Sequence, residues 1–342
     1  MNRRRFMAIT GIGMASVAGC SGDGQDDQPT EGDGSGSAGD GAETTTERAR
    51  TEQEQTEATP QTASVAVGEV VEGEQMSMVV RGVERTQSLG QFQEADPGNT
   101  YVVVSLAVKN RTESEFVGFS GLLQTQLKDS EDYTYDQTIA VTDQTFQGGQ
   151  LAPGEVSRGD LVYEVPTDAS GLVLQFDFQA FSFFEFDRVT VDLASEADPV
   201  GDLTQELKVD VHDVGESVSY GDVTVAVNSV SFETSLGQFS QADDGNEFAI
   251  IDITTENGTD DQLQLSTLLQ MKMKDGTGAS YQLSITALTA LDRAYNESQP
   301  LAPGESRRGQ IAYEVPQGVN PLYWTFEFTL WVDGDKTFWQ VR

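Results

Sequence analysis

Two segments of the 342-residue chain occur twice, and this duplication constrains the fold more than any other feature of the sequence. Residues 88–99 match residues 235–246 at 9 of 12 positions. Residues 151–166 match residues 301–316 at 11 of 16 positions. The two offsets, 147 and 150 residues, are almost the same. The chain therefore contains two copies of one module, each long enough to fold around its own core.

The modules are expected at residues 64–195 and 207–342, joined by an acidic linker at 196–206. In both, apolar side chains alternate with a period of two, which is typical of strands with one buried face. The residues expected on the inward faces of two equivalent strands are Val102, Val104, Leu106, Val108, Ala249, Ile251 and Ile253. The same alternation predicts another strand over residues 324–332.

Turn-forming residues separate the predicted strands. Ala-Pro-Gly at 152–154 and again at 302–304 fits a type II turn, because proline fixes φ and glycine supplies a positive φ. Apolar residues at helical spacing predict one short helix within 285–293. Short alternating strands divided by such turns predict an all-β protein with two tandem immunoglobulin-like antiparallel β-sandwiches.

The first 20 residues are organised like an export signal. Arg3, Arg4 and Phe6 resemble a twin-arginine translocation motif, and the apolar run after them is shorter than the ~20 residues that span a bilayer. Cys20 ends a stretch of small residues that resembles a lipobox, which implies a lipid on its thiol. These resemblances predict an extracytoplasmic protein that the lipid on Cys20 anchors to the cell membrane.

Residues 21–63 carry eleven acids, two bases and no large apolar side chain, which predicts a disordered acidic linker. The whole chain has 20 Lys and Arg against 56 Asp and Glu, a net charge of −36. Such a surface repels phosphate backbones, so nucleic acid is not expected as a partner. One cysteine and one histidine allow neither an internal disulfide nor a His/Cys zinc site.

Several short motifs carry a family resemblance. They are Gly98-Asn99, Lys128-Asp129, Leu-Ala-Pro-Gly-Glu155, Tyr-Glu-Val-Pro166 and their second copies. Together they resemble the telokin-like, immunoglobulin-like domain of unknown function found in exported lipoproteins, a family that includes immunoprotective extracellular proteins. The resemblance implies an extracytoplasmic β-sandwich without an assigned biochemical role. The excess of acids with few lysines is similar to proteins of extreme halophiles, which implies molar salt as the solvent.

The sequence contains no nucleophile elbow, zinc-protease motif or nucleotide-binding loop, so neither catalysis nor a cofactor is expected. No metal is expected either; the weak candidates are the loop residues Asp96, Asn99, Asp243 and Asn246. N-glycosylation sequons begin at Asn110, Asn257 and Asn296. Trp331 is out of phase with the core aromatics and is the candidate for an interaction surface.

The sequence supports two functions of different class. The first is a surface protein that acts as a binding or adhesion module, or as a structural part of the envelope, with another envelope protein or a glycan as partner. The alternative is an accessory or solute-binding lipoprotein that delivers a ligand to a transporter; a hydrolase is a third class. A solute binder should have one deep pocket where the modules meet, whereas an interaction module should show only a shallow exposed patch.

Overall fold

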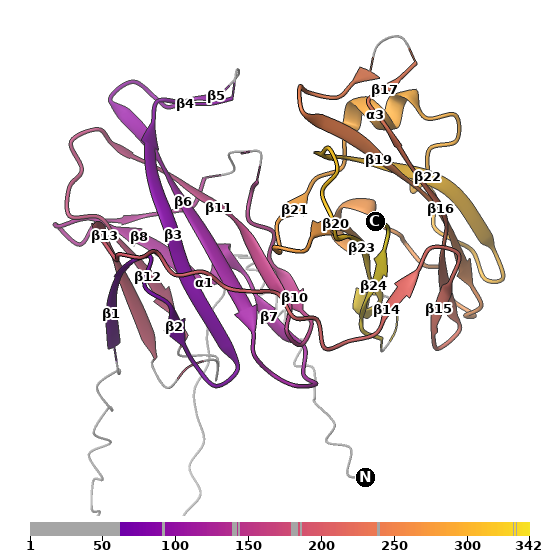
Figure 1. The fold of residues 1–342 in the computed structure, drawn as a ribbon, viewed down its shortest axis with the longest axis horizontal. Helices are drawn as coiled ribbons and strands as arrows, with labels where there is room; N and C mark the ends of the chain where they lie inside the picture. Colours follow the sequence, from indigo (N-terminus) through magenta and orange to yellow (C-terminus); the bar gives the residue numbers. More distant parts are fainter. Residues whose placement is uncertain are drawn as a thin grey trace, which may run out of the picture. The chain divides into compact units, whose positions relative to one another are not determined.

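The computed structural model describes residues 62–90, 93–138, 142, 144–178, 184, 187–237, 240–330, 332 and 334–342. Both modules belong to one compact unit, Glu57–Arg342. The predictions for Arg3, Arg4, Phe6, Cys20 and Trp331 lie outside the described residues, and so does the predicted linker up to residue 61. The last two residues assigned to that linker, Thr62 and Ala63, instead begin the first strand. The protein is all-β, with a β-sandwich in each module (Figure 1), as the period-two pattern predicts.

Module 1 consists of two main sheets. The first contains β1 (Thr62–Val67), β8 (Thr125–Lys128), β9 (Thr134–Tyr135), β12 (Val173–Asp177) and β13 (Arg188–Glu196), in the order β1-β13-β12-β8-β9. The second contains β2 (Val71–Glu72), β3 (Met76–Thr86), β6 (Asn99–Asn110) and β11 (Val156–Pro166), in the order β11-β6-β3-β2. Two small ribbons and a helical turn complete it: β4 (Ser88–Leu89) with β5 (Gln93–Glu94), β7 (Val117–Phe119) with β10 (Gly149–Leu151), and α1 (Gly121–Gln124).

Module 2 repeats this arrangement. Its first sheet contains β14 (Val211–Asp213), β20 (Met271–Asp275), β21 (Ser280–Tyr281), β23 (Leu322–Glu327) and β24 (Lys336–Gln340), in the order β14-β24-β23-β20-β21. Its second sheet contains β15 (Ser217–Tyr220), β16 (Val223–Glu233), β19 (Asn246–Asn257) and β22 (Ser306–Pro316), in sequence order. The remaining elements are β17 (Ser235–Leu236), β18 (Ser240–Gln241), α2 (Thr267–Gln270), α3 (Ile285–Ala290) and the 3-10 helix η1 (Phe328–Leu330).

The core of each sandwich lies between its two sheets, and the predicted inward faces are confirmed. All seven inward residues named from β6 and β19 are at most 1% exposed. The Ala-Pro-Gly turns also form as expected, because Gly154 and Gly304 have φ of 77° and 73°. The predicted short helix is confirmed as α3.

Two details differ from the prediction. The sandwiches are not purely antiparallel, because β1 pairs in parallel with β13 and β14 pairs in parallel with β24. The strand predicted over 324–332 ends at Glu327, where the chain enters η1. Trp324, Phe326 and Phe328 are fully buried as expected, but Leu330 is 59% exposed because the helical turn breaks the alternation.

Candidate functional site

The residues weighed as metal ligands hold loops to strands instead. The backbone N–H of Asp96 and the side-chain amide of Asn99 both donate to Glu164 Oε1, at 2.7 and 3.1 Å. Asp243 and Asn246 make the same two bonds to the equivalent glutamate of module 2, at 2.7 and 3.2 Å. Within the described part of the chain, no three His, Cys, Asp or Glu side chains are grouped so that they could hold a metal ion.

Two of the three sequon asparagines are structural. Asn110 Nδ2 donates to the carbonyl oxygens of Glu115 and Leu151 at 2.7 and 2.8 Å, and its side chain is fully buried. Asn257 makes the equivalent pair of bonds and is 1% exposed. Since both amide hydrogens are used, the folded modules present neither nitrogen to a glycan. Of the three predicted glycosylation sites, Asn296 is the one with an exposed side chain.

The structure brings together several charged residues that the sequence did not predict as a site. They lie where the two modules meet, which we call the module interface. Here residues 155–158 of module 1 contact β20, β24 and the segment after β20 in module 2. Glu155 lies at the centre and is fully buried. Its Oε2 accepts the N–H of Ala152 at 2.7 Å, which closes the Ala-Pro-Gly turn. Its Oε1 accepts from Lys274 Nζ, and from Lys336 Nζ at 2.6 Å.

Both lysines make a second bond to module 1. Lys274 Nζ donates to the carbonyl of Val156 at 2.9 Å, and Lys336 Nζ donates to that of Gln150 at 3.1 Å. Their side chains are 3% and 2% exposed. The small cavity that Glu155, Lys274 and Lys336 themselves line has a volume of only about 10 Å³, room for no more than about one water. The interface is therefore a nearly dry ionic contact, where charges interact strongly.

Opposing effects set the protonation of this cluster. Burial raises the pKa of Glu155, but the positive charges of Lys274 and Lys336 together outweigh it and lower the pKa to about 2. Burial is the main cause that lowers the pKa of Lys274 to about 8, and attraction to Glu155 offsets it only in part. At neutral pH the carboxylate and this ammonium are therefore both ionised.

Arg158 forms a second contact between the modules. Its Nε donates to the carbonyl of Thr277 in module 2, and its Nη2 donates to the carbonyl of Leu203 in the linker. The backbone N–H of Arg158 also donates to the carbonyl of Gly278 at 3.0 Å. Gly278 has φ of 92°, and a Cβ there would lie 2.4 Å from the carbonyl oxygen of Val156. A glycine is therefore required for the two backbones to approach this closely.

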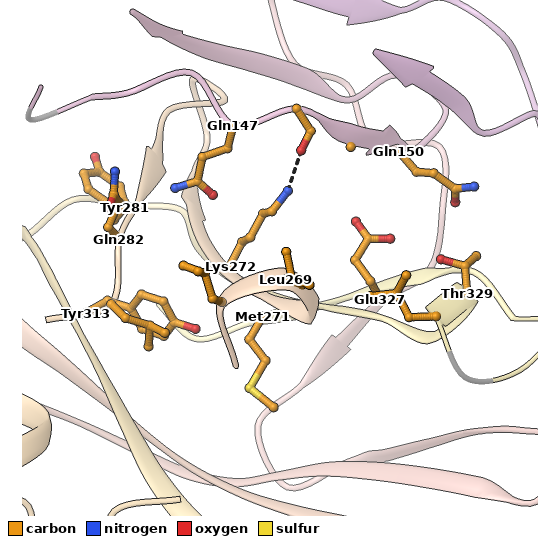
Figure 2. Close-up of a pocket in the computed structure, with 15 residues that line it drawn as sticks. Gln147, Gln150, Leu269, Met271, Lys272, Tyr281, Gln282, Tyr313, Glu327 and Thr329 are labelled. Carbon is orange, nitrogen blue, oxygen red and sulfur yellow. Dashed lines mark hydrogen bonds between the residues drawn. The ribbon is translucent and has the colours of Figure 1, made fainter. Parts of the chain in front are cut away.

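A cavity of about 500 Å³ lies beside the charge cluster, and both modules line it. Residues 147–150 form one wall, and α2, β20, β21 and η1 supply most of the rest. The lining is mostly apolar and includes Leu268, Leu269, Met271, Leu283 and Leu330. Figure 2 shows Lys272 and Glu327 extending in the same direction, toward the segment that contains Gln147 and Gln150.

The two charged residues of the lining are differently paired. Lys272 Nζ donates to the carbonyl of Gly148 at 2.8 Å. Burial, reinforced by the charge of Lys336, lowers the pKa of Lys272 to about 8. Glu327 is 6% exposed; its Oε1 is 4.0 Å from Lys336 Nζ and accepts no hydrogen bond among the described residues. Burial raises the pKa of Glu327, although Lys336 and Lys272 act against this.

Two exposed leucines beside the cavity belong to a third repeated motif, Ser-x-Leu-Leu-Gln, at 120–124 and 266–270. In α2, Ser266 Oγ accepts the N–H of Leu269, and Gln270 Oε1 accepts the N–H of Ser266. These caps hold Leu268 and Leu269 outward, 69% and 63% exposed. The equivalent leucines of α1 are exposed as well but do not line the cavity. The cavity therefore uses the copy in module 2 only.

A family of known sequences matches the chain twice, once in each of the two modules. The sequence pattern of DUF4352, a domain of unknown function, matches residues 65–183 and 212–336, once in each module. The chain belongs to the DUF4352 family. Both DUF4352 matches lie within the modules expected from the repeats. No curated protein matches the chain in a sequence search.

Three solved structures are similar to this chain at low sequence identity. An uncharacterized β-sandwich protein from Clostridium difficile is 17% identical and aligns over 40% of this chain and 99% of its own, with a TM-score of 0.29. A protein from Bacillus subtilis described as a candidate lipoprotein is 11% identical over 55% of this chain and 73% of its own, with a TM-score of 0.30. A secreted protein from Mycobacterium tuberculosis is 12% identical over 40% of this chain and 98% of its own, with a TM-score of 0.30. In the described part of this chain, no helix is long and apolar enough to cross a membrane.

Proposed function

We propose that this protein is a non-catalytic ligand-binding protein of the cell surface, and that the cavity at the module interface is its binding site. The cavity itself is the observation that supports this. Its volume of about 500 Å³ lies within the ~300–1,000 Å³ typical of small-molecule sites, and its lining is mostly apolar with a few polar groups. Small-molecule sites also occur preferentially where two domains meet.

Of the two functions expected from the sequence, the cavity favours the solute-binding alternative. An adhesion module would need only an exposed surface, and would have no use for an apolar cavity built from both modules. The ligand would be small, with a largely apolar body that contacts Leu268, Leu269 and Met271. Delivery to a transporter in the membrane is consistent with a soluble module held near that membrane.

The export signal and the lipid on Cys20 complete the proposal. In this view Arg3, Arg4 and Phe6 direct twin-arginine export, and the lipid holds the protein on the extracytoplasmic face of the cell membrane. Replacing Cys20 with serine should release the protein from the membrane fraction or block its processing. Unchanged membrane retention of the C20S variant would contradict the anchor.

The charge of −36 supports a working solvent of molar salt. At 1 M ionic strength the Debye length is about 3 Å, so surface carboxylates that are farther apart hardly repel one another. The ion pairs of the interface are buried and are screened much less. The modules would therefore keep their mutual contact in a solvent that removes most long-range electrostatic effects.

The binding function is tested by blocking the cavity. A library of small apolar molecules is screened by thermal unfolding against the wild type and against two variants, Leu269→Trp and Leu123→Trp. Leu269 lines the cavity, whereas Leu123 is its exposed counterpart in α1 and does not. A ligand of the cavity should raise the Tm of the wild type and of L123W but not of L269W. A screen without any such ligand, or ligands that stabilise L269W equally, would refute the site.

A further inference from the structure

The charges around the cavity do not balance. The charge cluster and the lining of the cavity together contain three lysines and two glutamates: Lys272, Lys274, Lys336, Glu155 and Glu327. Arg158, at the second contact, pairs with Asp202 and adds no net charge. Glu155 binds both Lys274 and Lys336, and Glu327 lies 4.0 Å from Lys336. Three lysines against two glutamates leave one positive charge over, in a protein that is strongly negative as a whole.

The unmatched charge is that of Lys272. Among the described residues, its Nζ has no carboxylate oxygen within ion-pair distance, and its one hydrogen-bond acceptor is the neutral carbonyl of Gly148. An ammonium carries three donors, so two remain for other acceptors. Because Lys272 is only partly buried and lines the cavity, a ligand there can reach these donors.

The comparison of the two modules sets Lys272 apart from the rest of the sheet. Lys274 has a counterpart in Lys128, and the cross-strand pair Glu327 with Lys336 has a counterpart in Asp177 with Arg188. The residue equivalent to Lys272 is Gln126, which is neutral and exposed. The sheet therefore does not need a cation at this position in order to fold. The extra charge occurs only where the apolar cavity adjoins it.

We infer that the cavity binds an amphiphile with a single carboxylate, whose head pairs with Lys272 and whose apolar body contacts the leucines and Met271 of the lining. This inference rests on the proposed function and adds the chemical class of the ligand. A carboxylate accepts the two remaining donors of Lys272 and supplies the missing negative charge. The lowered pKa of Lys272, to which the charge of Lys336 contributes beside burial, agrees with an interface that lacks negative charge.

The experiment compares three ligands with the same chain and different heads: decanoate, decan-1-ol and decylammonium. Affinities are measured by isothermal titration calorimetry at fixed molar salt, with each ligand below its micellar concentration. Decanoate should bind at least about tenfold more tightly than the alcohol, since hydrogen bonds to charged groups are worth ~1.5–3 kcal/mol. Decylammonium should bind most weakly.

Variants then identify the head-group partner. Lys272→Gln installs the residue of the equivalent position in module 1 and should remove the preference for decanoate while leaving the affinity for decan-1-ol unchanged. Lys272→Arg, which keeps the charge, should retain the preference. Lys128→Gln removes a lysine from the equivalent sheet of module 1 and should change neither affinity.

The outcomes separate the two proposals. If decan-1-ol or decylammonium binds as well as decanoate and L269W abolishes it, the cavity is a ligand site but the carboxylate inference is wrong. A preference for decanoate that survives in K272Q would also overturn the role of Lys272. If none of the three ligands binds and the library screen also fails, both proposals fail.

Discussion

The buried carboxylate of Glu155 offers the sharpest test of how the modules are held together. Glu155→Gln keeps the size of the side chain and an oxygen that can accept the N–H of Ala152, but it removes the negative charge. Two ammonium groups, with side chains 3% and 2% exposed, are then left without their carboxylate. The variant therefore removes the charge of Glu155 and its two hydrogen bonds to lysine while it keeps the size of the side chain.

Two estimates give the size of the effect. The pKa of Glu155 is lowered from 4.5 to about 2, and at 1.36 kcal/mol per unit this corresponds to ~3 kcal/mol. Independently, removing one partner of a buried ion pair typically costs ~3–5 kcal/mol. The free energy of unfolding of E155Q should thus fall by ~3 kcal/mol. The ion pairs need not contribute net stability for this, because the cost comes from the buried lysines that remain.

Module 2 supplies the matched control. Glu305 occupies the equivalent turn and accepts the N–H of Ala302 at 2.9 Å, but it is only partly buried and pairs with Arg307 of its own module. Glu305→Gln should therefore change the unfolding free energy by less than ~1 kcal/mol. Urea denaturation at fixed molar salt measures both variants, with circular dichroism as the probe. Equal losses for E155Q and E305Q, or a loss below ~1 kcal/mol for E155Q, would refute the reasoning.

The pH dependence of the same variant adds a second check. A carboxyl whose pKa is lowered by folding stabilises the protein fully above its unfolded pKa of 4.5, and this contribution is lost as the pH falls toward 2. The difference between the wild type and E155Q should therefore shrink over this range, while the other carboxyls titrate in both proteins. A difference that stays constant from pH 5 to pH 2 would show that the charge of Glu155 does not cause it.

Three further predictions use other parts of the chain. Asn110→Ala should lower the unfolding free energy in urea by ~2 kcal/mol, because two buried carbonyl groups lose their donor, whereas the exposed Asn296→Ala should stay within ~0.5 kcal/mol of the wild type. The affinity for decanoate should fall as the pH rises through about 8, because Lys272 loses its proton there; a flat calorimetric profile from pH 7 to pH 10 would contradict this. The charged groups that face Lys272 and shape this profile are Lys274, Lys336, Glu155 and Glu327. Desalting should unfold both modules, and a β-type circular dichroism spectrum that persists at low salt would show that the fold does not depend on salt.

The sequence was sufficient for the fold because the repeats and the alternation of apolar residues are local signals. Alternation identified the inward faces of β6 and β19 correctly, since burial between two sheets requires it. It failed after Glu327, where apolar residues continue but the backbone turns into η1. The parallel pairing of β1 with β13 was also missed, because the partner of an edge strand is not encoded in that strand's own pattern.

The site was harder to predict because its residues are far apart in the sequence. Glu155 was visible only as part of a turn motif, and Lys274 only as part of a Lys-Asp pair. Asp275 does shape the turn after β20, where it accepts the N–H groups of Thr277 and Ala279, and Asp129 has the same role in module 1. A signal for Lys272 did exist, because Met271 to Lys274 alternates apolar and basic residues, which places both lysines on the outer face of one strand.

Divergence between the copies explains why one turn forms an interface and the other does not. Glu305 accepts hydrogen bonds from Arg307, two residues farther along the chain, so its carboxylate is paired within module 2. The position equivalent to Arg307 in module 1 is Ser157, which has no charge to offer. Glu155 therefore accepts its hydrogen bonds from the lysines of module 2.

Divergence between the copies also affects the cavity, through Lys272. With the module 1 residue Gln126 in place of Lys272 alone, the cluster and the lining of the cavity would contain two lysines and two glutamates. Lys272 in place of that glutamine leaves one positive charge without a carboxylate partner, although the contact between the modules does not require it. A residue that adds an unpaired charge next to an apolar cavity works against stability, since burial lowers its pKa. Such a cost is expected where a residue serves a ligand rather than the fold.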